Sequence, residues 1–378
     1  MLKFPEKFYW GTAASAYQTE GGIKNDWSVA GAKPRQGRGK YDAGLACDHY
    51  NRFEEDFDLA KNMNNNAHRF SIEWARIEPE EGKFDQKEIE HYRKVILALK
   101  QRGLEPFVTL YHWTLPVWFV EKGGWLNPDA PKYFERFVEK IVLEYKDLVK
   151  FWITLNEPNI YVFFSFSVGA WPPFKKNWFK SRKVFKQLVI AHNIAYQIIH
   201  KICPDAKAGI SYQKGNSIIV NYEWIYKFLA HIKNSQDFIG LNYYVNSFFT
   251  SLWQKLFQKK SGVTDLNWQI YPKGIYCALK DLKQYNKPIY ILENGLADKN
   301  DTKRAKFIID HLKWIHKAIS EGIDVKGYFH WSLIDNFEWD KGFTPRFGLV
   351  EIDYNNDLKR IPRKSSQVFA EICKNNAI

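Results

Sequence analysis

The chain has 378 residues, of which 45% are hydrophobic and 26% are charged. These proportions are ordinary for a globular protein, so they exclude a disordered, a collagen-like or a coiled-coil chain. The formal net charge is +13, but the basic residues are spread along the whole chain. We therefore attribute the charge to a lysine-rich surface and expect no nucleic-acid partner.

Cysteine spacing and hydropathy narrow the class of protein further. The four cysteines are far apart, and no Cys-x-x-Cys pair or zinc-type cluster occurs, so the sequence predicts neither a disulfide framework nor a metal site. It shows no signal-peptide core and no run of about 18 apolar residues. We expect a cytoplasmic protein with no membrane partner, and its oligomeric state stays open.

Short apolar runs alternate with amphipathic stretches along the chain. In chain order, the runs predict strands over Phe8–Thr12, Asn66–Ser71, Glu105–Leu110, Val149–Thr154, Lys207–Tyr212, Asp237–Tyr243, Pro288–Leu292 and Val325–His330. Helical periodicity separates most of them, as in Gln86–Arg102 and Pro131–Tyr145. Eight strand–helix units without a linker predict an α/β fold, a single (β/α)₈ barrel domain over residues 1–378. A doubly wound sheet is the alternative, but the glycine-rich phosphate-binding motifs are missing.

Polar and aromatic residues lie at or just after the ends of seven of the eight predicted strands. The chemistry of such a barrel lies at the carboxyl ends of its strands, so we expect these side chains to meet at one rim. They are, in chain order, Gln18, Glu20, Arg69, His112, Trp113, Asn156, Glu157, Asn242, Tyr244, Glu293, Trp331, Glu338 and Trp339.

Two glutamates directly follow apolar strands. Glu157 follows the fourth strand and Glu293 the seventh, and these strands face each other across an eight-stranded barrel. The two carboxylates are therefore expected on either side of one small ligand. Glycosidic cleavage needs such a pair, one group as proton donor and the other as nucleophile or base. For either glutamate taken alone, an ion-pair or helix-capping role is the alternative.

Eight segments of the sequence resemble glycoside hydrolase family 1, the β-glucosidase family with a (β/α)₈ fold. They run through most of the chain in family order, and the last, 28 residues long, is the most specific. The segments are Phe8–Gly22, Ala46–Phe57, His68–Pro79, Tyr111–Trp118, Thr154–Asn159, Phe238–Tyr244, Tyr290–Asp298 and Gly327–Tyr354.

The resemblance implies roles for the matching residues. Glu157 would be the general acid/base and Glu293 the nucleophile of a retaining β-glycosidase, which needs neither a metal nor a cofactor. The residues that would bind the sugar are Gln18, His112, Asn156, Trp331, Glu338 and Trp339, and those that would support the nucleophile are Arg69, Asn242 and Tyr244. The expected substrates are small β-D-glucosides cleaved at the terminal non-reducing sugar, with β-galactosides and β-fucosides as further candidates.

Two other functions within the same resemblance stay open. A 6-phospho-β-glycosidase would need serine and lysine near the 6-position of the sugar, where Glu338 would repel a phosphate. A catalytically inactive carbohydrate-binding relative usually lacks one of the two glutamates, and this sequence has both.

Three features depart from the family pattern. Thr114 stands where family members often have aspartate, and the loop Ala170–Phe179 has an unusual sequence. Only 24 residues separate Tyr212 from Asp237, so the region between the fifth and sixth strands is shortened. We expect nearby aromatic residues to fill part of this gap, namely Trp224, Tyr226, Phe228 and those of Ser247–Phe257. The alternative is a flexible or ligand-accessible opening, or a surface for self-association. In both cases we expect the mouth of the site to admit bulky aglycones.

Overall fold

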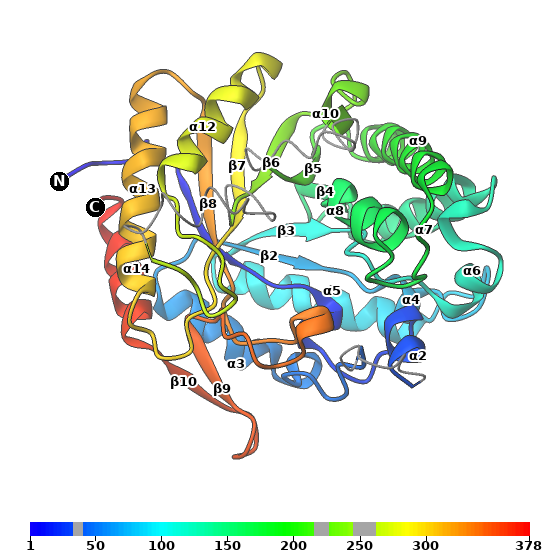
Figure 1. Cartoon of the computed structure of the whole chain (residues 1–378), viewed down its shortest axis with the longest axis horizontal. Coiled ribbons are helices and arrows are strands. Elements are labelled where there is room, and N and C mark those ends of the chain that lie inside the picture. The colour runs from blue at the N-terminus through cyan, green and yellow to red at the C-terminus, as the bar shows by residue number, and fades with distance from the viewer. Residues whose placement is uncertain (33–40, 215–226, 245–261) are drawn as a thin grey trace.

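A closed barrel of eight parallel strands forms the centre of the computed structural model, which describes residues 1–32, 41–214, 227–244 and 262–378 (Figure 1). The strands are β1 (Tyr9–Ala13), β2 (Ala67–Ser71), β3 (Glu105–Thr109), β4 (Phe151–Asn156), β5 (Lys207–Gln213), β6 (Phe238–Asn242), β7 (Ile289–Asn294) and β8 (Val325–Trp331). β1 pairs with both β2 and β8, which closes the barrel. The predicted fold is confirmed, and each predicted strand lies within two residues of an observed one.

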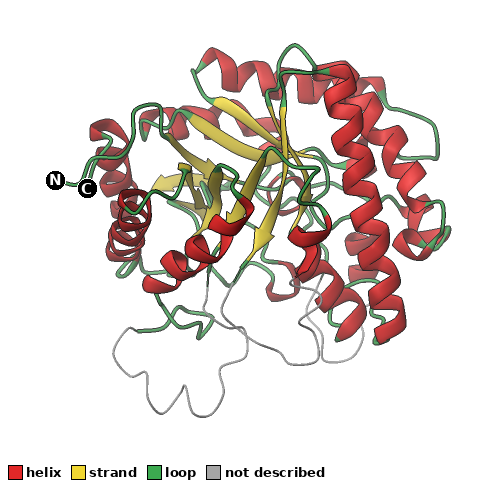
Figure 2. Ribbon diagram, turned by 90° about the horizontal axis from the view of Figure 1, so that it is seen from above, coloured by secondary structure: helices red, strands yellow, loops and turns green. Residues whose placement is uncertain are grey.

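Helices surround the barrel, as the view from above shows (Figure 2). The longer ones are α3 (His49–Asn62), α5 (Gln86–Gln101), α7 (Ala130–Tyr145), α9 (Trp178–Ile202), α12 (Lys273–Leu282), α13 (Arg304–Ser320) and α14 (Lys364–Asn375). α5 illustrates how the sequence sets such a helix. The Asp85 side chain accepts hydrogen bonds from the backbone N–H groups of Lys87 and Glu88, which caps the first turn.

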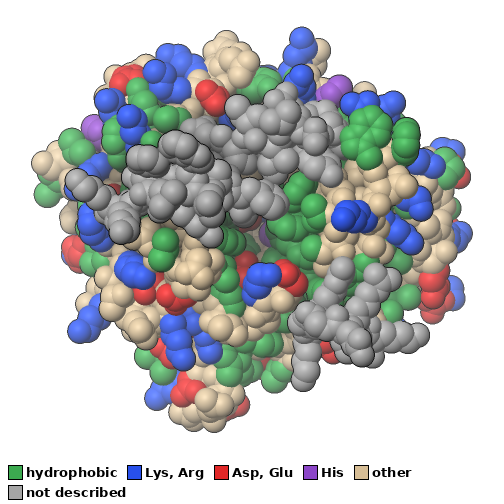
Figure 3. All heavy atoms as spheres, viewed as in Figure 1, with side chains coloured by type: hydrophobic (Ala, Val, Ile, Leu, Met, Phe, Trp, Pro, Cys, Tyr) green, Lys and Arg blue, Asp and Glu red, His purple; other side chains and the backbone are tan. Residues whose placement is uncertain are grey.

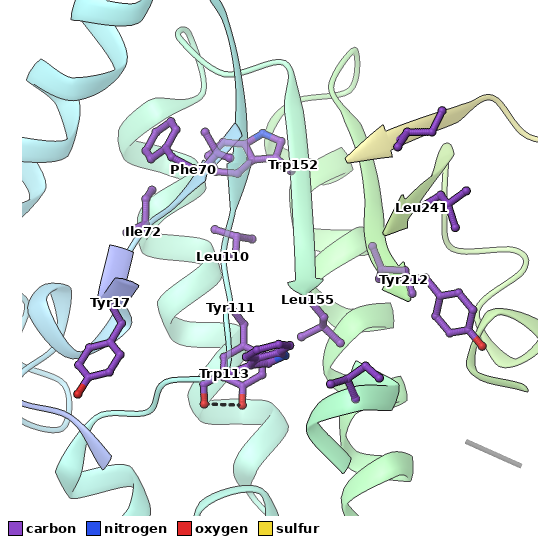
Figure 4. Packing of buried hydrophobic residues seen from close by; sticks show 14 of the residues in the cluster. Tyr17, Phe70, Ile72, Leu110, Tyr111, Trp113, Trp152, Leu155, Tyr212 and Leu241 are labelled. Atoms are coloured by element: carbon purple, nitrogen blue, oxygen red, sulfur yellow. Dashed lines mark hydrogen bonds between the residues drawn. The ribbon is translucent and has the colours of Figure 1, made fainter. Parts of the chain in front are cut away.

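Apolar side chains fill both sides of the strands, as a parallel sheet covered by helices requires. Inside the barrel, the rings of Phe107 and Phe151 stack with centroids 4.2 Å apart, and Phe329 and Tyr290 pack against Phe107. Figure 4 shows side chains of the outer core between strands and helices, among them Phe70, Trp152, Leu155 and Leu241.

The connection between β5 and β6 is short, as predicted. Its described part contains α10 (Phe228–His231), and Phe228 is fully buried against Phe185 of α9, with ring centroids 5.2 Å apart. Phe228 therefore contributes to the packing of this side. Trp224, Tyr226 and Ser247–Phe257 lie outside the described residues, so the expected filling of the gap by these aromatics stays a prediction.

The chain after β8 brings the C-terminus next to the N-terminus. A two-stranded antiparallel sheet of β9 (Val350–Asp353) and β10 (Lys359–Pro362) leads into α14. The two termini lie side by side in both ribbon views (Figures 1 and 2), and the backbone N–H of Leu2 donates to the carbonyl of Ile378 at 2.7 Å.

Candidate active site

A cavity of about 340 Å³ lies at the carboxyl ends of the strands. This volume is in the range of small-molecule sites. Eight of the predicted site residues line it, namely Gln18, His112, Glu157, Tyr244, Glu293, Trp331, Glu338 and Trp339. The other three, Arg69, Asn156 and Asn242, are fully buried and hydrogen-bond to the lining residues.

Two donors hold the carboxylate of Glu293, near the end of β7. The guanidinium of Arg69 forms an ion pair with Oε1, and the hydroxyl of Tyr244 donates to Oε2 at 2.7 Å. Burial, together with the charges of Glu293 and Glu157, raises the pKa of Tyr244 well above its usual value, so the phenol keeps its proton. Both oxygens of Glu293 are thus held in place.

Arg69 also sets the orientation of Asn156, the last residue of β4. Its Nη2 donates to Asn156 Oδ1 at 2.7 Å, and its Nε donates to Thr109 Oγ1 at 3.1 Å. Because a guanidinium only donates, Asn156 must present its oxygen to Arg69. The amide nitrogen of Asn156 then faces His112 Nε2 at 3.1 Å.

His112 is a neutral imidazole in this arrangement. Burial, with a contribution from the charge of Arg69, holds the pKa of His112 well below its usual value. Since Nε2 accepts from Asn156, the single ring proton lies on Nδ1. Among the described residues, Nδ1 is buried and has no hydrogen-bond partner.

Glu157 occupies a different environment from Glu293. Its backbone is in the left-handed region, with φ 42° and ψ 57°, and its N–H donates to the carbonyl of Ser211 at 2.7 Å. Such a conformation costs a non-glycine residue about 1–3 kcal/mol and is common where function fixes the backbone. The side chain accepts a hydrogen bond from Asn242 Nδ2 at 2.7 Å. Burial, and then the negative charge of Glu293, raise the pKa of Glu157 well above its usual value.

Aromatic and polar groups from the end of β8, from the chain after it and from α1 (Ala16–Thr19) complete the inner cavity. The rings of Trp331 and Trp339 lie nearly parallel to that of His112, with centroids 6.2 and 6.0 Å away. Gln18 Nε2 donates to the carbonyl of Phe337 at 2.8 Å and to Glu338 Oε2 at 3.4 Å. Burial and the charge of Glu293 raise the pKa of Glu338 to about 8, so this group is mostly protonated at neutral pH.

Sequence reasoning missed the outer wall of the cavity. Ile160, Phe164, Trp171, Leu266, Trp268, Asp340 and Lys341 also line it. Trp171 stacks on Phe164 with centroids 4.6 Å apart, and its Nε1 donates to Asp340 Oδ1 at 3.2 Å. The unusual sequence of the loop Ala170–Phe179 was the one signal that pointed to Trp171.

Two residues that follow predicted strands have other surroundings. Glu20 does not line the cavity and forms an ion pair with Arg76, with Nε and Oε2 2.8 Å apart. Trp113 does line it, and its Nε1 donates to the carbonyl of Asn156 at 2.9 Å. Glu20 therefore stabilises the structure beside the site, whereas Trp113 forms part of its wall.

The described part of the chain contains no group of three His, Cys, Asp or Glu side chains that could hold a metal ion. Among these residues, no helix is long and apolar enough to cross a membrane. On the face shown in Figure 3, basic side chains are interspersed with acidic and apolar ones.

Comparison with known proteins gives the same family as the sequence motifs. A family model described as glycosyl hydrolase family 1 matches residues 1–221 and 226–378. The chain is 32% identical to the 1,4-beta-D-glucan glucohydrolase of Thermotoga neapolitana, and the alignment covers 100% of both chains. That alignment extends over 443 positions, so this 378-residue chain lacks several tens of residues that the relative has.

Two solved structures share the fold over the whole of this chain. The beta-glycosidase from Pyrococcus horikoshii has a TM-score of 0.91 and 39% identity, with 100% of this chain and 96% of that chain covered. The beta-glucosidase from Thermotoga maritima in complex with glucoimidazole has a TM-score of 0.91 and 32% identity, with 100% of both chains covered. The chain therefore belongs to glycosyl hydrolase family 1 and is a glycoside hydrolase.

Proposed function

We propose that the protein is a retaining β-glycosidase that releases the terminal non-reducing sugar from small β-D-glucosides, with Glu293 as nucleophile and Glu157 as general acid/base. The observation that supports this most is the contrast between two carboxyl groups in one cavity. Glu293 is bound by Arg69 and Tyr244, whereas Glu157 is buried with a raised pKa and accepts from an amide. Environments that differ in this way separate a nucleophile from a proton donor.

The reaction follows in two displacements. An oxygen of Glu293 attacks the anomeric carbon, the glycosidic bond breaks, and the departing oxygen takes the proton of Glu157. Glu157, now a carboxylate, removes a proton from water, and the hydroxyl attacks the anomeric carbon. The bond to Glu293 breaks and the sugar leaves with its configuration retained.

The inner cavity offers groups suited to a sugar ring. Indoles such as Trp331 can cover the apolar face of the ring, and Gln18, His112 and Glu338 can bond its hydroxyl groups. β-Galactosides and β-fucosides present the same face and most of the same hydroxyls, so they are further candidate substrates.

The acidic groups near the cavity disfavour a 6-phosphoglucoside. Lys341 lines the cavity, but its ammonium is 2.5 Å from Asp340 Oδ2, which offsets its charge. Glu338, which is mostly protonated at neutral pH, supplies no cation to pair with a phosphate. A dianionic phosphate would therefore meet unfavourable electrostatics here.

Both glutamates proposed as catalytic line the cavity. A catalytically inactive carbohydrate-binding function is therefore also disfavoured.

Removal of the proton donor tests the proposal. We expect Glu157→Ala to lower kcat/KM for methyl β-glucoside by about 10²–10⁴-fold, because this poor leaving group needs the proton. The 2,4-dinitrophenyl glucoside, whose leaving group needs no proton, should lose far less. Steady-state kinetics on the two substrates measure the contrast, and added azide should yield β-glucosyl azide from the dinitrophenyl substrate.

Glu293→Gln serves as the matched control. This variant should fold, as judged by its melting temperature, yet turn over neither substrate and form no β-glucosyl azide. Equal losses on both substrates in Glu157→Ala, or full activity in Glu293→Gln, would show that the roles are assigned wrongly.

A further inference from the structure

Ser211 connects two elements of the site from a strand for which no functional residue was predicted. It lies near the end of β5, is fully buried and does not line the cavity. Its carbonyl accepts from the backbone N–H of Glu157 at 2.7 Å, and its hydroxyl donates to Asn242 Oδ1 at 2.5 Å. In the barrel register it lies opposite Asn156 of β4 and beside β6, which ends at Asn242. One serine therefore contacts both Glu157 and the residue that donates to its carboxyl.

The orientation of the Asn242 amide follows from its neighbours. Arg69 can only donate, so Asn156 turns its Oδ1 toward Arg69. The same oxygen lies 3.4 Å from the amide of Asn242, which must therefore present its nitrogen there. That nitrogen also reaches Glu157 Oε1 at 2.7 Å. The oxygen of Asn242 then faces Ser211, and among the described residues no other side chain donates to it.

We propose that Ser211 is a positioning residue, which fixes the side-chain amide of Asn242 with its nitrogen toward the carboxyl of Glu157. Without the hydroxyl, Asn242 Oδ1 would be a buried acceptor with no donor, so the orientation that donates to Glu157 would lose one of the hydrogen bonds that hold it. The opposite orientation of the amide would present its oxygen to Glu157. This inference rests on the proposed role of Glu157 as the general acid/base.

The two amide orientations favour opposite protonation states of Glu157. An N–H donor stabilises the carboxylate, whereas a carbonyl oxygen stabilises the protonated acid. The first displacement uses the acid and the second uses the carboxylate, so the amide sets the balance between the two steps. Loss of the Ser211 hydroxyl should therefore raise the pKa of Glu157 and slow water activation.

The pH dependence of Ser211→Ala tests this directly. We expect the upper pKa in the kcat/KM profile for methyl β-glucoside to move to higher pH by about half a unit or more. In the dinitrophenyl glucoside reaction, where the second displacement limits turnover, kcat at pH 6 should fall while KM falls with it. Ser211→Thr, which keeps a hydroxyl, should restore both. Unchanged profiles in a folded Ser211→Ala protein would overturn the proposal.

A double-mutant cycle separates positioning from simple packing. If Ser211 acts through Asn242, then adding Ser211→Ala to Asn242→Ala should cause no further shift in the pH profile. Independent, additive shifts would overturn the proposal even if Ser211→Thr fails to fold. Because Glu157→Ala is measured alongside, its leaving-group dependence tests the proposed function separately. If Glu157→Ala shows the expected leaving-group dependence but Ser211→Ala leaves the upper pKa of the pH profile unchanged, only the role of Ser211 is rejected.

Discussion

The buried carboxyl of Glu73 contacts Thr114, which stands where family members often have aspartate. Its Oε2 accepts from the hydroxyl of Thr114 at 2.8 Å, and its Oε1 accepts from Asn25 Nδ2 at 3.4 Å. Burial is the main cause that raises the pKa of Glu73 to about 7, and the charge of Glu20 adds to it. A hydroxyl at position 114 can donate to this group, which an ionised aspartate cannot do.

The raised pKa of Glu73 makes stability depend on pH. The folded protein keeps a proton that the unfolded chain loses between about pH 4.5 and pH 7. The contribution of Glu73 to the free energy of unfolding therefore falls as pH rises across this window, by on the order of 2–3 kcal/mol, and stays low above it. Glu73→Gln lacks this contribution. The stability of the variant relative to the wild type should therefore rise between about pH 4.5 and pH 7.

Denaturant unfolding at a series of pH values measures this difference. Glu80 provides the control, because its side chain is 68% exposed and pairs with the similarly exposed Lys83, so Glu80→Gln should change the stability little. Parallel curves for Glu73→Gln and the wild type would contradict the prediction.

At the scale of elements, the ends of β7 and β8 are held close together just beyond the nucleophile. Gly295 follows β7, and a Cβ atom at this position would lie 1.8 Å from the carbonyl oxygen of Trp331, the last residue of β8. The glycine therefore permits the close approach that places Glu293 and Trp331 in one cavity.

Gly295→Ala should force these two strand ends apart. Overpacking of this kind costs about 1–3 kcal/mol, and here the displaced groups belong to the site, so activity should fall more than stability alone explains. Melting temperature and kcat/KM measure both effects. Gly322→Ala is the control, since a Cβ there meets nothing within 4 Å and the variant carries only the strain of a positive φ. Equal activity in the two variants would refute the argument.

The strands were predictable from the sequence because each is a short apolar run between helical stretches. The ends of β4 and β7 were harder to predict. Each strand continues two residues beyond its predicted end, where the pairing with its neighbour is irregular, and no local sequence pattern indicates this. The inner cavity was found because its polar residues directly follow strands. Ser211 was missed because a serine in a buried strand gives no such signal, and Trp171 and Trp268 because they lie on loops whose position depends on tertiary packing.

At the scale of the whole molecule, Asn376 joins the two ends of the chain at the amino ends of the strands, away from the cavity. It follows α14 with a left-handed φ of 49°. Its Oδ1 accepts from the indole Nε1 of Trp10 at 2.8 Å, and its Nδ2 donates to the carbonyl of Phe4 at 3.0 Å. The last helix is thereby bonded to the first strand.

Asn376→Gly should remove the side-chain hydrogen bonds that join the two ends of the chain, while glycine can still adopt the left-handed backbone conformation of this position. The loss leaves the buried indole N–H of Trp10 without its partner, which costs about 1–3 kcal/mol. We expect a lower free energy of unfolding and an unchanged kcat/KM, because the site lies at the other end of the barrel. The exposed neighbour provides the control, and Asn375→Ala should change neither quantity. A large loss of activity in Asn376→Gly would show that the two ends of the barrel are coupled.

The aromatic packing inside the barrel also determines how molecules enter and leave the site. Phe329 precedes Trp331 by two residues on the same face of β8, so the layer formed with Phe107, Phe151 and Tyr290 lies directly beneath the cavity. Among the described residues, this layer closes the way through the barrel, so substrate, departing alcohol, water and released sugar must all pass through the mouth of the cavity. Water reaches the covalent intermediate only after the alcohol has moved aside. An alcohol that stays at the entrance competes with water for the bound sugar, so at high alcohol concentration the architecture favours transfer of the sugar over its hydrolysis.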